Sequence, residues 1–465
     1  LHQLTEQNGS FKVLQDSLSG ITEDRRIQLL LIAFCFGAFF EGAAGFGTPV
    51  AVTAAILIGL GFSPLAASGL SLIANTAPVA FGALGTPVIT LAQVHGYDLH
   101  EVTAMIGRQL PFFSLLVPFW LIWAFAGRKG MMEIWPAILV TGLSFAIPQY
   151  LVSNFMGPEL VDIIAAVVSM LSLVAFLRVW QPKKVWTSPA MRGKDSSAAE
   201  AKPPQPVVRH SREALIAAWT PWAILSVFVF IWGLPPVKAW LNSVFAPKFP
   251  IAGLHNLIMK VPPVVTTPHP EAAVYTLNLL SATGTGILLA AVISAIVMKY
   301  KPVAIVRTFF STAWMVRYSL LTIVLMLALG TLTRFSGTDT TLGLAFANTG
   351  VLYPFFGTLM GWIGVALTGS DTASNVLFGG MQKVAAEQLG LSPNLMGAAN
   401  SSGGVMGKMI DAQSIVVAST ATRWFNKEGE ILRYVFFHSI ALACLVGVFV
   451  TMQAYVWPFT LMVVR

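Results

Sequence analysis

The sequence predicts an all-α polytopic membrane protein, and three observations support this fold class. The chain has 465 residues, of which 55% are hydrophobic and 10% charged, whereas a soluble domain carries about 25% charged residues. Its mean hydropathy is +0.73, and its apolar runs are continuous rather than alternating, which favours helices over membrane strands. Glycine-rich polar breaks interrupt several of these runs. Such breaks predict helices that stop and restart within the membrane.

The charge distribution predicts topology rather than nucleic-acid binding. The formal net charge is +8, and the segment 179–213 is the most basic part of the chain. Because cytoplasmic loops of membrane proteins are rich in Lys and Arg, this segment is expected to be a flexible cytoplasmic loop. Counting crossings from it places the loop 235–275 on the external side. No nucleic-acid partner is expected.

The stretch EGAAGFGTP (41–49) predicts the tip of a re-entrant hairpin. It lies between the apolar runs 27–40 and 50–62. Each arm has about 13 residues, which as a helix is shorter than the ~30 Å hydrocarbon core. The segment 27–62 is therefore expected to enter the membrane and turn back. The segment 64–94, interrupted by ANTAPVAFGALGTP (74–87), is expected to be a broken helix.

The same order of elements recurs near the C-terminus. The tip TGSDTASN (368–375) lies within a second predicted hairpin, 351–390, and a second broken helix is expected over 391–420 with its break at 398–413. Glu41 precedes Ser63-Pro64 by 22 residues, and Asp371 precedes Ser392-Pro393 by 21, so the two carboxyls are assigned to matching tips. An odd number of crossings separates the hairpins, which predicts an inverted-topology repeat with a site near the membrane midplane.

The domain organisation follows from these assignments. The expected parts are a first repeat core (1–109), transmembrane helices (110–178), the basic loop (179–213), transmembrane helices with the external loop (214–342), a second repeat core (343–420) and a C-terminal transmembrane helix (421–465).

Polar residues at the interruptions are the candidate substrate ligands. A helix that starts inside the membrane presents free N–H groups and the positive end of its dipole, which suits a small anion. Hydroxyl and amide groups there can bind a carboxylate or a hydroxyl, and glycine allows close approach of backbone. The predicted substrate-binding residues are Gly45, Thr48, Asn75, Thr76, Thr86, Thr372, Ser374, Asn375, Asn400, Ser401, Ser402 and Lys408. For any single Ser or Thr, helix capping is the competing interpretation.

Ionisable groups at membrane depth are the candidates for ion coupling, because burying each of them costs about 2.5–3.5 kcal/mol on insertion scales. Glu41, Asp371 and Asp411 are the predicted proton-coupling residues. Lys408 lies three residues before Asp411, on the same helical face, so it is expected either to pair with Asp411 or to face the substrate carboxylate. No enzyme signature and no cofactor-binding motif was found in the sequence, so an enzyme is not expected.

Several long strings identify the chain as similar to a known family. FCFGAFFEGAAGFGTPVAVTAA (34–55), SLIANTAPVAFGALGTPV (71–88), GRQLPFFSLLVPFWL (107–121), SNFMGPELVDI (153–163), LSATGTGILLAA (280–291) and TGSDTASNVLFG (368–379) resemble the bacterial L-lactate permease family. The resemblance extends over nearly the whole chain. Family chains extend further at the N-terminus, and this chain is expected to lack those additional helices.

The resemblance implies import of L-lactate, D-lactate and glycolate with protons across the bacterial inner membrane, by an elevator-type transporter. It implies lactate, protons and the lipid bilayer as partners, and a homodimer is one candidate assembly. The Ser-Asn-Thr sodium motif of related dicarboxylate carriers is replaced by Ala-Asn-Thr (74–76) and Ala-Asn-Ser-Ser (399–402), which favours protons. The alternatives are a sodium-coupled carrier of another small organic anion and an uncoupled anion channel or sensor.

Overall fold

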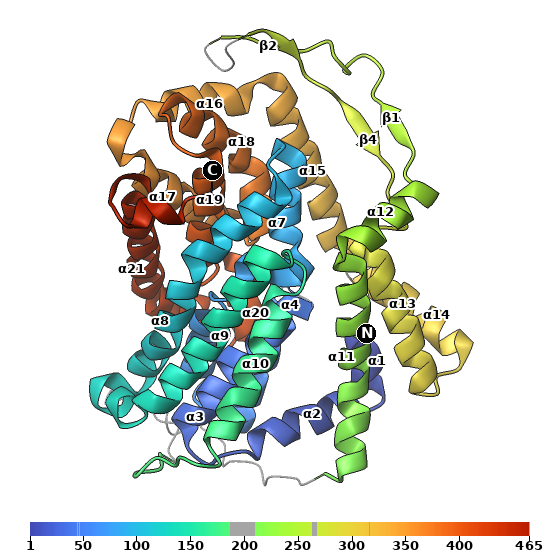
Figure 1. Cartoon of the computed structure of the whole chain (residues 1–465). Helices are drawn as coiled ribbons and strands as arrows, with labels where there is room; N and C mark the ends of the chain where they lie inside the picture. The colour runs from blue at the N-terminus through green and yellow to red at the C-terminus, as the bar shows by residue number, and fades with distance from the viewer. Residues whose placement is uncertain (44, 46, 187–209, 263–266, 316, 465) are drawn as a thin grey trace.

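The protein is a bundle of helices with two small antiparallel sheets at its upper end, as the computed structural model shows (Figure 1). The structure describes residues 1–43, 45, 47–186, 210–262, 267–315 and 317–464. These residues contain six helices long and apolar enough to cross a membrane, or seven if one bent pair is counted as a span. This architecture agrees with the predicted multi-pass membrane protein.

The first interrupted segment turns back on itself, but its first arm is longer than predicted. After the short helices α1 (His2–Gln7) and α2 (Ser10–Ser19), an unbroken helical stretch comprises α3 (Arg25–Leu29), the π-helical η1 (Leu30–Phe36) and α4 (Gly37–Ala43). It has 19 residues because the Asp24 carboxylate caps its start by accepting a hydrogen bond from Arg26 N. The expected length of about 13 residues, which assumed that both arms are too short to cross, is therefore wrong for this arm.

Close packing shows that the chain reverses between α4 and α5 (Thr48–Gly59). A Cβ atom on Gly37 would lie 3.2 Å from Thr53 Cγ2, so residues at similar distances from the break face each other. The first arm is also 94% buried, whereas the other spanning candidates are 28–50% buried. The first hairpin therefore lies inside the protein rather than against lipid.

The next helix is broken within the predicted range 74–87. Helix α6 (Pro64–Ala74) begins at Ser63, whose hydroxyl accepts a hydrogen bond from Ala66 N. The 3-10 turn η2 (Val79–Phe81) and α7 (Gly82–His95) follow, at an angle of 64° to α6. Ala83 and Leu84 have positive φ angles of 48° and 60°, a region that non-glycine residues rarely occupy.

Three long helices form a layer behind the first hairpin. They are α8 (Leu99–Glu133), α9 (Trp135–Phe155) and α10 (Val161–Phe176), and α10 packs against both η1 and α4. Helix α8 begins 11 residues before the predicted boundary at 110, because Asp98 Oδ1 accepts a hydrogen bond from Glu101 N and caps it. Its first turns are polar, so hydropathy alone does not mark its start.

The basic loop and the external loop belong to opposite ends of the molecule. The described residues next to the basic loop lie at the lower end, and the external loop lies at the upper end (Figure 1). Most of the predicted loop 179–213 lies outside the described residues. Helix α11 (Arg212–Gly233) runs from the lower end to α12 (Pro235–Val244). At the upper end, β1 (Lys248–Pro250) pairs with β4 (Val274–Thr276), and β2 (Met259–Lys260) pairs with β3 (His269–Pro270).

Glu271 fastens this external loop to the helical bundle. Its carboxylate pairs with Lys260 at 2.9 Å and with Arg334, which also donates a hydrogen bond to Val94 O of α7. Burial raises the pKa of Glu271, but the hydrogen bonds from Lys260 and Arg334 outweigh it and hold the pKa below its usual range. The ion pairs therefore form at neutral pH and connect the loop to α7.

The second hairpin follows α13 (Thr283–Val297), α14 (Pro302–Met315), α15 (Arg317–Ser336), α16 (Thr338–Ala347) and η4 (Gly350–Leu352). It consists of α17 (Tyr353–Thr368) and α18 (Asp371–Gln388). Near the tip, the Ser374 hydroxyl donates to Gly361 O at 3.2 Å, and further away the Tyr353 hydroxyl donates to Gln382 Oε1 at 2.8 Å. The two helices are therefore antiparallel neighbours.

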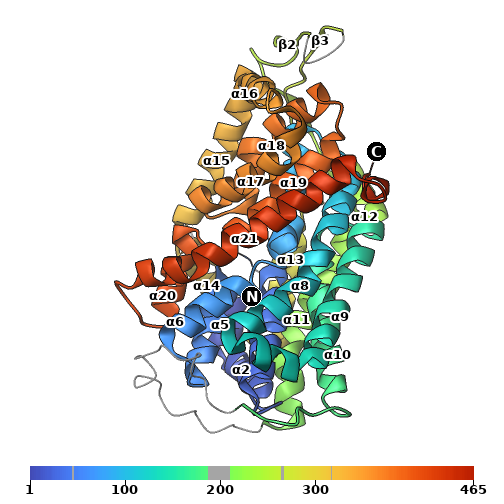
Figure 2. The same cartoon turned by 90° about the vertical axis from the view of Figure 1, so that its left-hand side faces the viewer.

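The last elements are α19 (Pro393–Gly407), α20 (Ala412–Ala421), α21 (Glu428–Tyr455) and η5 (Phe459–Met462). Helix α21 crosses the others obliquely (Figure 2) and packs against α17 and α19. The break between α19 and α20 spans residues 408–411, which is only the end of the predicted 398–413. The predicted break at Asn400 to Ser402 is wrong, because these residues stay helical, and Asn400 and Ser401 donate hydrogen bonds to residues of α18.

A buried arginine holds the lower end of the first arm. Arg26 is fully buried and forms ion pairs of 2.7 Å with Asp24 and with Glu133 at the end of α8. It also donates hydrogen bonds to the carbonyls of Gly130 and Lys184. One side chain thus joins the first hairpin, α8 and the segment after α10.

We expect Arg26→Met to destabilise the protein by about 3–5 kcal/mol, because it leaves the buried Asp24 carboxylate without its ion-pair partner. Chemical unfolding in detergent micelles would measure this change. Lys427→Met is the matched control, since Lys427 pairs with Glu430 at an exposed site and such pairs contribute about 0–1 kcal/mol. Equal unfolding midpoints for the two variants would contradict the anchoring role of Arg26.

Candidate functional site

The interruptions of both halves meet around one small cavity in the protein interior. Its volume is about 40 Å³, which is room for about three water-sized groups. The lining residues come from α4, from the α6–α7 break, from the tip of the second hairpin and from the end of α19: Glu41, Val79, Gly82, Ala83, Pro87, Gly369, Ser370, Asp371, Thr372 and Lys408. Four predicted site residues, Glu41, Asp371, Thr372 and Lys408, therefore lie together.

Glu41 is held against the broken helix of its own half. It is 4% exposed, and its Oε2 accepts a hydrogen bond of 3.1 Å from Asn75 Nδ2. A Cβ atom on Gly82 would lie 2.6 Å from Glu41 Oε1, so the carboxyl packs directly on the start of α7. Asn75, a predicted substrate ligand, thus positions Glu41 in this structure.

Asp371 is the first residue of α18. One oxygen, Oδ2, accepts hydrogen bonds from the Ser401 hydroxyl at 2.5 Å and from Asn375 Nδ2 at 3.3 Å. The other, Oδ1, is buried without a hydrogen-bond partner. Since Asp371 lines the cavity, this oxygen has unused capacity to bind a proton or a ligand group.

The two carboxyls are not at equivalent positions of the hairpins, contrary to the prediction from sequence spacing. Glu41 lies on the first arm, before the turn, whereas Asp371 begins the second arm. The second arms differ in length, with 12 residues in α5 and 18 in α18. Glu41 and Asp371 lie at similar distances in sequence, 22 and 21 residues, from the Ser-Pro pair that follows each of them. This similarity therefore does not mean that the two carboxyls occupy equivalent positions in the hairpins.

Lys408 forms the expected pair with Asp411 and also borders the cavity, whereas its contact with a substrate carboxylate stays a prediction. Its ammonium donates a hydrogen bond of 2.6 Å to Gly369 O at the second tip and lies 3.4 Å from Asp411 Oδ2, and it also lines the cavity. Asp411 caps α20, because its Oδ1 accepts a hydrogen bond of 2.7 Å from Ser414 N. Asp411 is therefore engaged as a helix cap and as the partner of Lys408.

The remaining polar residues of the second half join α18 to α19. Asn400 Nδ2 donates to Asn375 Oδ1 at 2.9 Å and to the Ser374 hydroxyl at 3.4 Å. Asn375 also donates to Pro87 O of α7 at 3.3 Å. These contacts explain why residues 400–402 remain helical, and they link the second hairpin to the broken helix of the first half.

Several predicted ligands do not line the cavity. Thr76 and Thr86 donate hydrogen bonds to backbone carbonyls three residues earlier, Ile73 O and Ala83 O, which is not the capping interpretation, since a capping oxygen accepts from a backbone N–H. Thr48 begins α5 and is partly buried. The Ser402 hydroxyl is buried without a hydrogen-bond partner. Gly45 packs on the α6–α7 break, since a Cβ there would lie 2.9 Å from that of Ala83.

The sequence prediction missed the lining residues without polar side chains, such as Gly82, Ala83 and Gly369. Gly82 lies directly against Glu41 because it has no side chain. Gly369 has a positive φ of 73°, a backbone conformation that favours glycine. Both lie within the predicted breaks, so the glycine pattern contained the signal. The N-terminus of α18 also lines the cavity, and its dipole favours an anion there.

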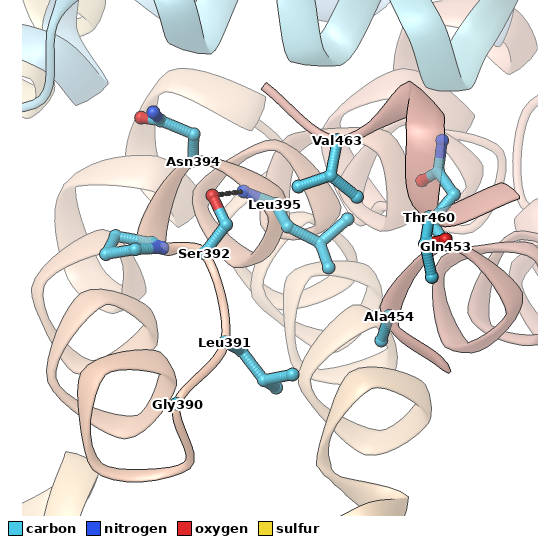
Figure 3. A pocket seen from close by; sticks show the side chains of 10 residues that line it. Gly390, Leu391, Ser392, Asn394, Leu395, Gln453, Ala454, Thr460 and Val463 are labelled. Carbon is cyan, nitrogen blue, oxygen red and sulfur yellow. Dashed lines mark hydrogen bonds between the residues drawn. The ribbon is translucent and has the colours of Figure 1, made fainter. Parts of the chain in front are cut away.

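A larger cavity lies elsewhere and is chemically different. It has a volume of about 410 Å³ and lies between the start of α19 and the end of the chain, lined by Ser392, Asn394, Gln453, Thr460 and neighbouring residues (Figure 3). Among the described residues that line it, none is ionisable and none belongs to the predicted site. We therefore take the cavity between the interruptions as the candidate site.

Comparisons with known proteins agree with this architecture. The family model described as L-lactate permease matches residues 1–457. The chain is 47% identical to the glycolate permease GlcA of Escherichia coli, 45% identical to the L-lactate permease of Salmonella typhimurium and 43% identical to that of Bacillus subtilis. Each alignment covers 98% of this chain and 83% of the relative.

Among solved structures, the Alcanivorax borkumensis YdaH transporter shares 13% identity with this chain. The match covers 90% of this chain and 87% of that one, with a TM-score of 0.35. A likeness of this size carries no argument about the fold.

A double-mutant cycle tests the coupling between Lys408 and Asp411. We expect Lys408→Met to destabilise the protein by about 3–5 kcal/mol, because Asp411 stays buried without its cation. Adding Asp411→Asn keeps an oxygen for the cap and removes the charge, so the double variant should be more stable than Lys408→Met alone. Unfolding midpoints in detergent measure all four proteins. Purely additive losses would show that the two side chains are not coupled.

Proposed function

The chain belongs to the L-lactate permease family, and from this premise we propose that it is a secondary transporter of L-lactate and related short 2-hydroxy monocarboxylates, including D-lactate and glycolate, in symport with protons. The names of its relatives supply the substrate class. The single observation that carries the proposal is the buried cavity between the interruptions, which combines one cation, one helix N-terminus and two carboxyls.

The cavity suits a small organic anion on electrostatic grounds. The Lys408 ammonium and the N-terminus of α18 favour the binding of a substrate carboxylate, because both carry positive charge. Thr372, which also lines the cavity, offers a hydrogen-bonding group for a substrate hydroxyl. The volume of about 40 Å³ suits a substrate of a few heavy atoms and requires some opening to admit it.

Proton coupling follows from the carboxyls that border the same cavity. A substrate anion placed beside ionised Glu41 and Asp371 would be repelled strongly in a medium of low dielectric constant. Protonation of either carboxyl removes that repulsion, so anion and proton would bind together. Of the three predicted proton-coupling residues, Glu41 and Asp371 line the cavity, whereas Asp411 is engaged by Lys408 and Ser414.

We propose that the two hairpins and two broken helices form an inverted repeat and move as an elevator-type transport unit. Supporting this, interruptions from both halves border one cavity, and hydrogen bonds such as Asn375 to Pro87 O join the halves. The carrier would lie in the bacterial inner membrane, with the end that holds α3 facing the cytoplasm and the β-strands outside. The proposed homodimer stays a prediction from the family.

Uptake of labelled L-lactate into proteoliposomes tests the proposal. We expect an imposed gradient, acidic outside, to drive accumulation above equilibrium, with glycolate and D-lactate competing. A sodium gradient at equal pH should have no effect. Accumulation that follows sodium and ignores pH would establish the sodium-coupled alternative, and uptake that never exceeds equilibrium under any gradient would indicate an uncoupled channel.

Glu41→Gln and Asp371→Asn should each lower gradient-driven uptake by about tenfold or more, the range expected for losing a coupling interaction. Each substitution keeps the side-chain shape and removes the proton-binding group. Asp98→Asn is the matched control, because Asp98 is an exposed residue that caps α8. Asparagine caps a helix about as well as aspartate. Full activity in both site variants would exclude these carboxyls from the coupling mechanism.

A further inference from the structure

Asp162 is a buried carboxyl that the proposed mechanism does not yet use. It is the second residue of α10 and is 1% exposed. Neither of its carboxylate oxygens has a hydrogen-bond partner. An ionised carboxylate in such surroundings is very costly, so a group of this kind is expected to hold a proton or to exchange one with a neighbour.

Asp162 lies directly behind the wall of the candidate site. A Cβ atom on Gly42, the residue after Glu41, would lie 2.8 Å from Asp162 Cβ. The segment before α10 packs on the start of α7, since a Cβ on Gly85 would lie 2.8 Å from Pro158 Cβ. Asp162 therefore packs against α4 at the residue next to Glu41, and the segment just before α10 packs on α7, against which Glu41 also lies.

Glu41 is the ionisable neighbour that interacts electrostatically with Asp162. The other ionisable residues on elements packed against α10 are engaged elsewhere. On η1, Cys35 Sγ lies 3.4 Å from the Ser169 hydroxyl, two turns along α10. On α7, His95 contacts the carbonyls of Asn375 and Val376 in α18. On α9, Tyr150 is 40% exposed at the outer surface, and Glu159, just before α10, pairs with Lys238.

We propose that Asp162 and Glu41 form a carboxyl pair that shares one transported proton. When Glu41 ionises toward the substrate cavity, its proton passes to Asp162, so that one O–H bond breaks as the other forms and the pair keeps one negative charge. Two buried carboxylates that interact electrostatically disfavour each other's charge, so the pair is expected to keep one proton. This inference rests on the proposed proton symport and deepens it by naming a second proton-holding residue.

The test separates coupled transport from exchange. Lactate exchange between the two sides of a proteoliposome membrane moves no net proton, whereas accumulation under a pH gradient does. We expect Asp162→Asn to keep exchange close to the wild-type rate, to lose gradient-driven accumulation by about tenfold or more, and to lose the dependence of accumulation on external pH. Asp98→Asn should match the wild type in both assays.

The outcomes decide the inference separately from the proposed function. If the wild type exchanges lactate but accumulates none under a pH gradient, the proton symport itself is wrong. If the wild type is coupled and Asp162→Asn accumulates lactate equally well, only the carboxyl pair is wrong. Loss of exchange and accumulation together in a folded Asp162→Asn protein would also overturn the pair, since it would indicate a role in substrate binding or movement.

Folding is checked by thermal melting in detergent. Asp162 makes no hydrogen bond that the substitution would break, so Asp162→Asn is expected to fold. If it does not, Asp162→Ser, which is smaller and also lacks the carboxyl, replaces it with the same expected results. Failure of both variants to fold would show that the carboxyl is a structural requirement, and the proposal would be rejected.

Discussion

The meeting of two interrupted helical segments in the interior is the constraint on which the rest of the structure depends. Interrupted backbone and carboxyl groups are tolerated at membrane depth only when protein encloses them. The layer of α8, α9 and α10 covers the first hairpin from one side, while α19 and α21 pack against the second. The near-complete burial of the first arm is the consequence. The long apolar helices thus surround the polar centre of the protein.

Much of this arrangement could be predicted, because glycine and proline mark interruptions in any environment. The reversal between α4 and α5, the second tip at 369–370 and the α6–α7 break all lie within the predicted segments. Helix starts that depend on one cap were harder: Asp24 and Asp98 extend their helices into polar sequence that hydropathy assigns to loops. The prediction of a break at Asn400 failed for another reason. Polar residues inside a membrane helix indicate either a break or a polar partner, and only the position of α18 decides between them.

The site shows the same limit. Glu41, Asp371 and Lys408 were predictable because a charge at membrane depth requires a reason. The positions of these residues relative to one another could not be predicted. The sequence spacing assigned Glu41 and Asp371 to matching positions, although they lie on different arms of their hairpins. The sequence assigns no role to Asp162, because its depth is set by the tertiary packing of α10 on α4. Its proximity to Glu41 joins residues more than one hundred positions apart, which no local pattern in a single sequence reports.

The balance of charge in this centre constrains how an anion can enter. Lys408 pairs with Asp411 at 3.4 Å, and this one cation is outnumbered by the carboxyls of Glu41, Asp371 and Asp162. These three carboxyls lie in or beside one cavity with few hydrogen-bond donors between them, and two of them have oxygens without a partner. Ionising all three in surroundings of low dielectric constant would cost far more than the fold can supply. In the proposed symport, the empty site therefore holds protons on these carboxyls, and an arriving substrate carboxylate would increase that requirement and so link substrate binding to proton binding.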